Sequence, residues 1–239
     1  MLEALPSLAE ILRFQKVPAA STVAALVDRV PTPWLEGVIQ LTAVRLSRGR
    51  RVNLATDSTG EATHQYDRWF DVRLGKASVR SRFLKLHALI DTRADRPYFL
   101  SAKVTAGTWG DSPQVPDLLD QVDPEIRIGN VVLDKGYQSR QNATLIEARG
   151  GLPVIALKAN ATAKCLGHPA WVRMVRRQRG DRRAHRMRYN RRAVIEGMFG
   201  GFKARFGSRV RARRRHAQRV EILLRVILWN VLAVVYHRV

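Results

Sequence analysis

Residues 128–137 read Ile128-Gly-Asn-Val-Val-Leu-Asp134-Lys-Gly-Tyr137, a short apolar stretch that ends in an aspartate and a glycine turn. A stretch of this kind is typical of a buried β-strand. It is followed by a segment that favours a helix over residues 139–148 and by a second apolar stretch over residues 153–157. Strands that alternate with helices form sheets with helices packed on their faces. The stretch therefore predicts an α/β fold.

Upstream of residue 128, the sequence favours strands with few helices between them. Val52-Asn-Leu-Ala-Thr56 is a β-prone stretch that leads to Asp57, and extended segments are expected over residues 66–74, 83–91 and 98–105. The last three are joined by short polar links, which indicates an antiparallel meander. A helix is expected through Leu118 and Leu119. Together these features predict a mixed sheet with helices on both faces.

Residues 6–46 favour short helices. Ser7 and Ser21 are candidate N-caps, and Pro31 and Pro33 are expected to open the next helix. Two short helices in succession could form a helix-turn-helix, but neither carries an evident set of base-reading side chains, which favours a simple helical lead-in. We therefore divide the chain into a helical segment over residues 1–50, which could serve as a reduced DNA-binding module, and a larger domain over residues 51–239.

The charge of the chain is strongly positive and unevenly placed. It has 42 Lys and Arg residues against 20 Asp and Glu residues, a formal net charge of +22. Residues 158–219 hold twenty of these bases and only two acids, which leaves +18 in that segment. Polyanions are the partners that exploit such a field, nucleic acid first and anionic membrane second. We expect residues 158–188 to form a loop or a mobile basic arm that contacts DNA phosphates.

Several sequence features bear on the compartment. Cys165 is the single cysteine, which permits no intrachain disulfide and no cysteine-built zinc site, and no secretory signal opens the chain. Residues 222–236 are apolar enough to raise the question of a membrane span, but Arg225 and Asn230 interrupt them. We therefore expect a buried terminal helix, no membrane partner and a cytoplasmic protein.

Three acidic residues are candidates for chemistry. Asp57 and Asp134 each follow a β-prone stretch, and the C-terminal ends of strands are where α/β sheets commonly present their functional groups. A long helix expected from Tyr189 supplies Glu196 as its only carboxylate. Three such acids can bind Mg²⁺ together with phosphate oxygens, and two ions can activate a water and stabilise a leaving oxygen. Asp91 and Asp111 are expected to be turn and capping residues.

The helix expected from Tyr189 has two distinct faces. At 3.6 residues per turn, four polar side chains fall within an arc of about 60°: Tyr189, Arg192, Glu196 and Lys203. A separate apolar arc is expected to pack on the sheet: Val194, Ile195, Met198, Phe199 and Phe202. Three glycines weaken the helix by about 1 kcal/mol each relative to alanine, which indicates either a close neighbouring backbone or a break near Gly200.

The polar face carries a recognisable signature. Tyr189-x2-Arg192-x3-Glu196-x6-Lys203 matches the Y-x2-R-x3-E-x6-K pattern of insertion-sequence transposases in families four and five. Asp57-Ser-Thr and Val-Val-Leu-Asp134-Lys-Gly-Tyr137 resemble the first and second acidic motifs of these enzymes, in the same order. The resemblance extends over about residues 52–236. It implies a ribonuclease H-like fold.

The resemblance also implies an activity. Asp57, Asp134 and Glu196 would bind Mg²⁺ or Mn²⁺, as two ions, and the enzyme would cut DNA at transposon ends and transfer the strands into target DNA. Its partner would be double-stranded DNA, bound by a homodimer or a larger assembly associated with the nucleoid of a bacterium or archaeon. We expect the following residues to contact DNA: Tyr189, Arg192, Lys203, Arg191, Arg188, Tyr137 and Lys135.

Two features depart from the usual pattern. Only 61 residues separate Asp134 from Glu196, too few for the large β-rich insertion of some family-four members, so the family-five arrangement is closer. The region before Asp57 is short, so the usual amino-terminal DNA-recognition module is expected to be reduced or missing. Two alternatives stay open: an inactive or truncated transposase-derived DNA-binding protein, and a stand-alone nuclease of the same fold.

Overall fold

The computed structural model describes residues 18–63 and 83–236, and it contains a five-stranded sheet of order β3-β2-β1-β4-β5. The strands are β1 (Val52–Ala62), β2 (Phe83–Asp91), β3 (Phe99–Ala106), β4 (Ile128–Leu133) and β5 (Leu152–Ile155). β1, β2 and β3 pair antiparallel, whereas β4 pairs parallel with both β1 and β5. The predicted mixed sheet is confirmed, and it is compatible with a ribonuclease H-like fold.

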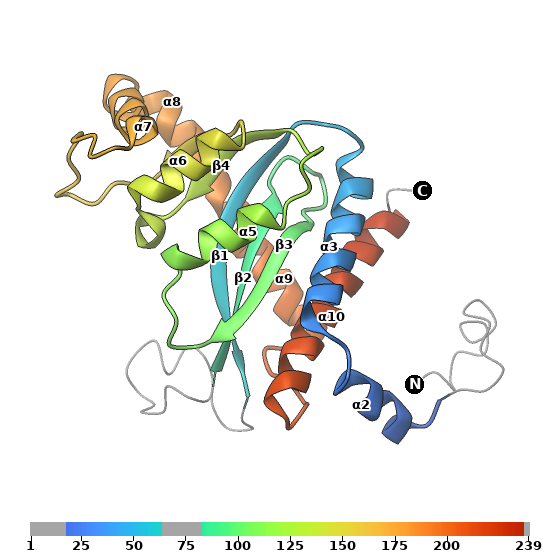
Figure 1. Ribbon diagram of the computed structural model, residues 1–239. Helices are drawn as coiled ribbons and strands as arrows, with labels where there is room; N and C mark the ends of the chain where they lie inside the picture. Colours follow the sequence, from blue (N-terminus) through green and yellow to red (C-terminus); the bar gives the residue numbers. More distant parts are fainter. Residues whose placement is uncertain (1–17, 64–82, 237–239) are drawn as a thin grey trace.

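Helices cover both faces of the sheet (Figure 1). One face carries α5 (Val115–Asp120), α6 (Arg140–Ala148) and α7 (Pro169–Gly180). The other carries α9 (Ala193–Phe206) and α10 (Arg215–Tyr236), and α3 (Thr32–Ser47) packs against α10 and β3. The remaining helices are α2 (Ala20–Val27) and α8 (Arg182–Tyr189), with short 3₁₀ turns at Ser112–Gln114, Lys135–Tyr137 and Asn190–Arg192.

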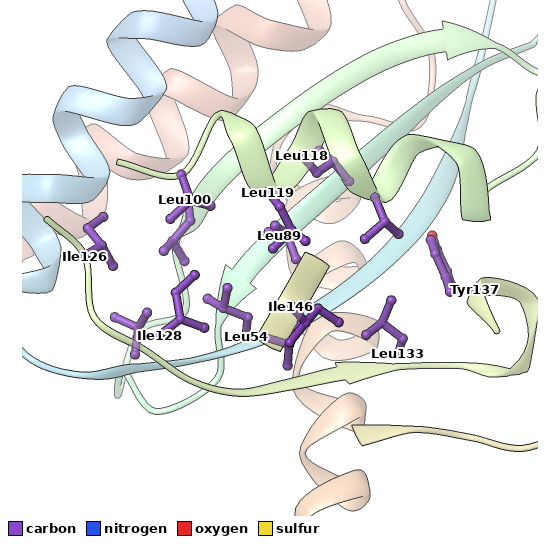
Figure 2. Close-up of a cluster of buried hydrophobic side chains, with 14 of the residues drawn as sticks. Leu54, Leu89, Leu100, Leu118, Leu119, Ile126, Ile128, Leu133, Tyr137 and Ile146 are labelled. Carbon is purple, nitrogen blue, oxygen red and sulfur yellow. The ribbon is translucent and has the colours of Figure 1, made fainter. Parts of the chain in front are cut away.

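Neighbouring residues of each strand point to opposite faces, which gives the sheet two cores. Leu54 of β1 and Leu133 of β4 belong to the core beneath α5 and α6 (Figure 2). Ala55 and Val132, the next or preceding residues, belong to the core beneath α9 and α10. Both cores are closed by apolar helix faces, including the predicted residues of α9: Ile195, Met198, Phe199 and Phe202.

β1 continues well past Asp57, so the prediction that Asp57 ends its strand is wrong. β4 pairs with β1 only as far as Ala55 opposite Val132, but β2 pairs with β1 all the way to Ala62 opposite Phe83. β2 thus supplies hydrogen bonds to the polar residues that follow Asp57, and this partner is distant in the sequence. Asp57 still lies level with the end of β4, because both chains advance two residues from that pair to Asp57 and Asp134.

Residues 158–188 are largely helical, so the prediction of a loop or mobile arm is wrong. Trp171, Met174 and Val175 of α7 are buried at helical spacing in the core beside α6. The indole Nε1–H of Trp171 donates to the carbonyl oxygen of Thr162 at 2.8 Å. Asp181 caps α8, where its side chain accepts a hydrogen bond from the backbone N–H of Ala184 at 2.8 Å. Only one face of α7 is buried, so a few apolar residues are enough to pack this helix against the core.

The amino-terminal helices agree in part with the sequence. α3 begins after Pro31, as expected, but Ser21 lies inside α2, whose N-cap is Ala19 and which has no side-chain cap. α3 shares its core with the sheet through Leu35 and Ile39. The boundary at residue 50 stays a prediction, and the expectations for Ser7 and residues 66–74 lie outside the described residues.

The expected burial of the terminal helix holds for one face only: α10 packs Val220, Leu223, Val226 and Asn230 against the rest of the fold, and its opposite face is exposed. In residues 18–63 and 83–236, no helix is both long and apolar enough to cross a bilayer.

Candidate active site

Asp57, Asp134 and Glu196 come together around a single guanidinium group. Nη2 of Arg192 lies 2.9 Å from Oδ2 of Asp57 and 3.7 Å from Oδ2 of Asp134. Nη1 of Arg192 lies 2.7 Å from Oε1 of Glu196. The three acids come from β1, from the end of β4 and from α9. The structure therefore places the three predicted acids within reach of one cation.

Local hydrogen bonds orient the two aspartates. Oδ1 of Asp57 accepts the backbone N–H of Ser58 at 2.9 Å. Oδ1 of Asp134 accepts the backbone N–H of Gly136 at 2.6 Å, which caps the 3₁₀ turn after β4. A Cβ at Gly136 would lie 3.0 Å from this same oxygen, so the turn favours glycine. The glycine turn seen in the sequence thus keeps the Asp134 carboxylate at the end of its strand.

α9 runs beside β1 in the same direction, and this explains the spacing between Glu196 and Lys203. Nζ of Lys203 donates to the carbonyl oxygen of Gly60 at 2.9 Å. Seven helical residues rise about 10 Å, and the three strand residues from Asp57 to Gly60 advance about 10 Å. Glu196 and Lys203 therefore lie level with Asp57 and Gly60. Lys203 is half-buried beside β1 and is separated from the acid cluster.

The single helix expected from Tyr189 is wrong, because α8 ends at Tyr189 and α9 begins at Ala193. The 3₁₀ turn Asn190–Arg192 lies between them and winds more tightly than an α-helix. Tyr189 therefore belongs to a different helix from Glu196, and its ring stacks on His185 with 6.1 Å between the centroids. Arg192 lies at the end of this turn, next to Asp57 in the middle of β1 and Asp134 at the end of β4.

α9 is unbroken through its glycines, so the alternative of a break near Gly200 is excluded. An added Cβ would meet nothing within 4 Å at Gly197 or at Gly200. At Gly201 it would lie 3.4 Å from the ring of Trp229. Only Gly201 thus has a close neighbour, and that neighbour is a side chain rather than another backbone.

Burial decides the electrostatics of the acid cluster. It raises the pKa of Asp57, and the backbone N–H of Ser58 and the guanidinium of Arg192 only partly offset this effect. Burial also acts to lower the pKa of Arg192, but Asp57 and Glu196 outweigh it and raise that pKa. The side chain of Asp57 is 19% exposed and that of Glu196 is 56% exposed. The cluster is acidic and partly buried, which favours a bound cation.

The donor set suits a hard divalent cation. All three side chains offer carboxylate oxygens, the ligand type that Mg²⁺ and Mn²⁺ prefer. In the part of the chain that the structure describes, no three His, Cys, Asp or Glu side chains stand close enough to form a ready-made metal site. Instead, the Arg192 guanidinium lies among the acids as their shared cation. The side chains are therefore of the type that binds a divalent metal, and in this structure they surround the guanidinium of Arg192.

The family model described as "Transposase DDE domain" matches residues 48–231. The chain belongs to this family. The match begins just before β1 and ends within α10, so it covers the whole sheet together with Asp57, Asp134 and Glu196. No curated protein and no solved structure matches the chain.

A second polar cluster in the DDE domain lies on the opposite face of β1 from Asp57. Oδ1 of Asp111 accepts hydrogen bonds from Oγ of Ser58 at 2.9 Å and Nζ of Lys85 at 3.1 Å. It also lies 3.5 Å from Nδ1 of His87, which is fully buried. Burial lowers the pKa of His87 to about 4, so this ring is neutral at pH 7.

The prediction that Asp111 is a capping residue is wrong. This aspartate occupies the N-cap position of a 3₁₀ turn, but its side chain makes no capping bond there and joins the cluster with Ser58 and Lys85 instead. No local sequence pattern links these residues, because it is the register between β1 and β2 that brings Ser58 opposite His87 and so assembles the cluster. Asp91, by contrast, is the last residue of β2 rather than part of a turn, but its side chain accepts the backbone N–H groups of Asn53 and Arg93 and so caps the bend that follows the strand, as predicted.

The remaining expected DNA contacts occupy different environments. Lys135 and Arg191 are exposed, and Arg188 is partly exposed. In the sequence, Lys135 directly follows Asp134, and Arg188 and Arg191 shortly precede Arg192. Tyr137 is 1% exposed and packs in the core beside Leu133 (Figure 2), so its contact with DNA stays a prediction.

Proposed function

We propose that the protein is an insertion-sequence transposase of the family-five type, which cuts double-stranded DNA at the ends of its element and joins those ends to target DNA. One observation carries the proposal. Acids from three separate elements, Asp57, Asp134 and Glu196, share one cation at distances of 3.7 Å or less. A structural ion pair needs one acid, whereas three acids around one point suit phosphate chemistry with divalent cations.

The three acids would hold two Mg²⁺ or Mn²⁺ ions, which when bound activate an attacking hydroxyl and stabilise the leaving oxygen of the phosphate. β1 and β4 hold Asp57 and Asp134 on the sheet, and Glu196 projects from α9 on the exposed side. Arg192 offsets the repulsion between the acids. Its planar guanidinium also suits bidentate binding of a phosphate once the acids have another cation.

The DNA backbone would be positioned by the surrounding bases. A cleft of about 740 Å³ lies between α7, α8 and the chain after β5, and five cations line it: Lys158, Arg179, Arg182, Arg183 and Arg186. Contacts to phosphates fix the register of a duplex without reading its sequence. Lys135, Arg188, Arg191 and the hydroxyl of Tyr189 would extend this surface towards the acids. The amine of Lys203 has to leave the carbonyl oxygen of Gly60 to reach a phosphate.

The proposal is tested with purified protein, Mg²⁺ or Mn²⁺, and labelled DNA from the ends of the element. Asp57→Ala and Glu196→Ala should each lower cleavage at least roughly 100-fold, because each removes a ligand that no neighbour replaces. Both variants should still bind DNA, since the basic cleft is unchanged. Asp117→Ala is the matched control, because this exposed acid of α5 pairs only with Lys103 in the described residues and should leave cleavage unchanged.

The outcomes separate the alternatives. Equal DNA binding by wild type and variants, with no cleavage by any of them, would identify a DNA-binding protein without activity. Cleavage without joining would identify a nuclease. Cleavage that survives Asp57→Ala would exclude the proposed acids.

A further inference from the structure

The outer face of α10 is apolar over its last four turns. Within residues 220–236, each exposed residue is apolar: Leu224, Leu228, Val231, Val235 and Tyr236. Leu228 is 51% exposed and Val235 is 53% exposed. Single exposed apolar residues are ordinary, but a contiguous set on one helix marks an interaction surface. The contrast is sharp in a chain whose formal net charge is +22.

Four of these residues form a regular seam. Leu224, Leu228, Val231 and Val235 are separated by four, three and four residues, which is the a/d spacing of a heptad. On a helix they fall within an arc of about 60°. The opposite side of α10 is occupied, because Val226 and Asn230 pack towards the sheet and α3. A narrow apolar seam of this spacing fits another helix better than it fits a flat surface.

Charge favours a second copy of this chain as the occupant. Two copies of a strongly basic protein repel each other where their cations meet, so a surface without charge lets them approach at the lowest electrostatic cost. The exposed residues of the seam carry no charge. Nucleic acid is a poor occupant for the same reason, since the seam offers no cation to its phosphates. A seam that packs on its own copy makes a closed two-fold contact.

The surroundings of the seam suit such a contact. α10 and α3 lie on the side of the molecule away from α7 and α8 (Figure 1), so pairing there leaves the basic cleft open. A groove of about 250 Å³ beside the carboxyl end of α10 has an apolar side formed by Pro97, Trp229, Leu232, Ala233 and Tyr236, and a charged rim formed by Asp95, Arg96 and Arg205. Its apolar side could receive an apolar side chain of the partner. We propose that the protein forms a two-fold dimer through the α10 seam. This names a surface for the homodimer that the family resemblance implies, and it does not depend on cleavage.

Sedimentation of the full chain tests the dimer. The protein is freed of nucleic acid and measured in about 1 M NaCl, where the repulsion between copies is screened. Wild type should sediment as a particle of about 54 kDa, twice the 27.1 kDa of one chain. Leu228→Glu should weaken the dimer at least roughly 100-fold, because it places two like charges in a seam that excludes water. Leu166→Glu, at a leucine that is 68% exposed outside α10, should leave the dimer intact.

A second measurement does not depend on the folding of the glutamate variant. Leu228→Cys in a Cys165→Ser background should cross-link to its own copy with a short bismaleimide, and Leu166→Cys in the same background should not. A wild type that stays monomeric up to about 100 μM would overturn the proposal, whatever else then covers the seam. A dimer that persists in a folded Leu228→Glu variant, or Leu228→Cys that fails to cross-link, would overturn it too.

Discussion

At the scale of single residues, Glu61 is the most strongly perturbed acid of the α9 and α10 core. It is fully buried, and burial raises its pKa to about 7, although Lys203 and Arg225 lower it. Between pH 4.5 and 7 the folded protein therefore holds a proton that the unfolded chain has released. Stability falls as the pH rises through this window, by about 3 kcal/mol in total. Glu61→Gln should remove this loss, and urea unfolding at about pH 4.5 and pH 8 measures it.

The comparison between wild type and Glu61→Gln isolates this effect from that of His87. The lowered pKa of His87 makes stability rise between about pH 4 and 6.5, but this contribution is present in both proteins and cancels in the difference. Glu125→Gln, at an exposed acid, should track wild type at each pH. Parallel profiles for Glu61→Gln and wild type would mean that Arg225 and Lys203 keep Glu61 charged in the folded state.

Local sequence signals were sufficient for some residues of the candidate site and insufficient for others. Asp134 follows an apolar strand and precedes a glycine turn, so its place at a strand end was predictable. Asp57 lies in mid-strand because β2 pairs with the polar residues that follow it, and no local pattern reports a partner thirty residues away. The position of Arg192 among the acids depends on a 3₁₀ turn that the signature does not reveal.

At the scale of elements, the glycines of α9 lower the stability of this helix without being required by its packing at every position. Gly200 is exposed in an unbroken helix, and an added Cβ there meets nothing within 4 Å. Gly200→Ala should therefore raise the free energy of unfolding by about 1 kcal/mol. The change appears as a higher urea midpoint at constant slope. Gly201→Ala should gain less, because its Cβ would lie 3.4 Å from the Trp229 ring. A lower midpoint for Gly200→Ala would show that α9 is not continuous there in solution.

The elements differ in how far their own sequence determines them. β4, α6 and β5 follow one another with apolar strands and the cap Ser139, and these were predictable. α7 was missed because its buried face consists of a few residues around Trp171 among arginines. Its stability comes from packing on α6, a tertiary contact that overrides the weak local pattern.

At the scale of the whole molecule, the positive charge is concentrated at α7 and α8 while the exposed α10 seam carries none. DNA affinity should therefore fall steeply with salt, with a slope of about −0.9 per phosphate neutralised. Replacing Arg182, Arg183 and Arg186 of the cleft by alanine should reduce that slope by up to about 3. Fluorescence anisotropy of a labelled duplex over a series of NaCl concentrations measures the slope.

A second triple variant distinguishes local contact from total charge. Arg29, Arg45 and Arg96 are exposed outside the cleft, and replacing them by alanine removes the same charge from the chain. If phosphates bind in the cleft, this variant should keep the wild-type slope, because counterions are released only where the protein contacts DNA. Equal loss of slope in both variants would mean that DNA binds diffusely over the basic surface, and the cleft beside α8 would lose its assignment as the path of the duplex to Asp57, Asp134 and Glu196.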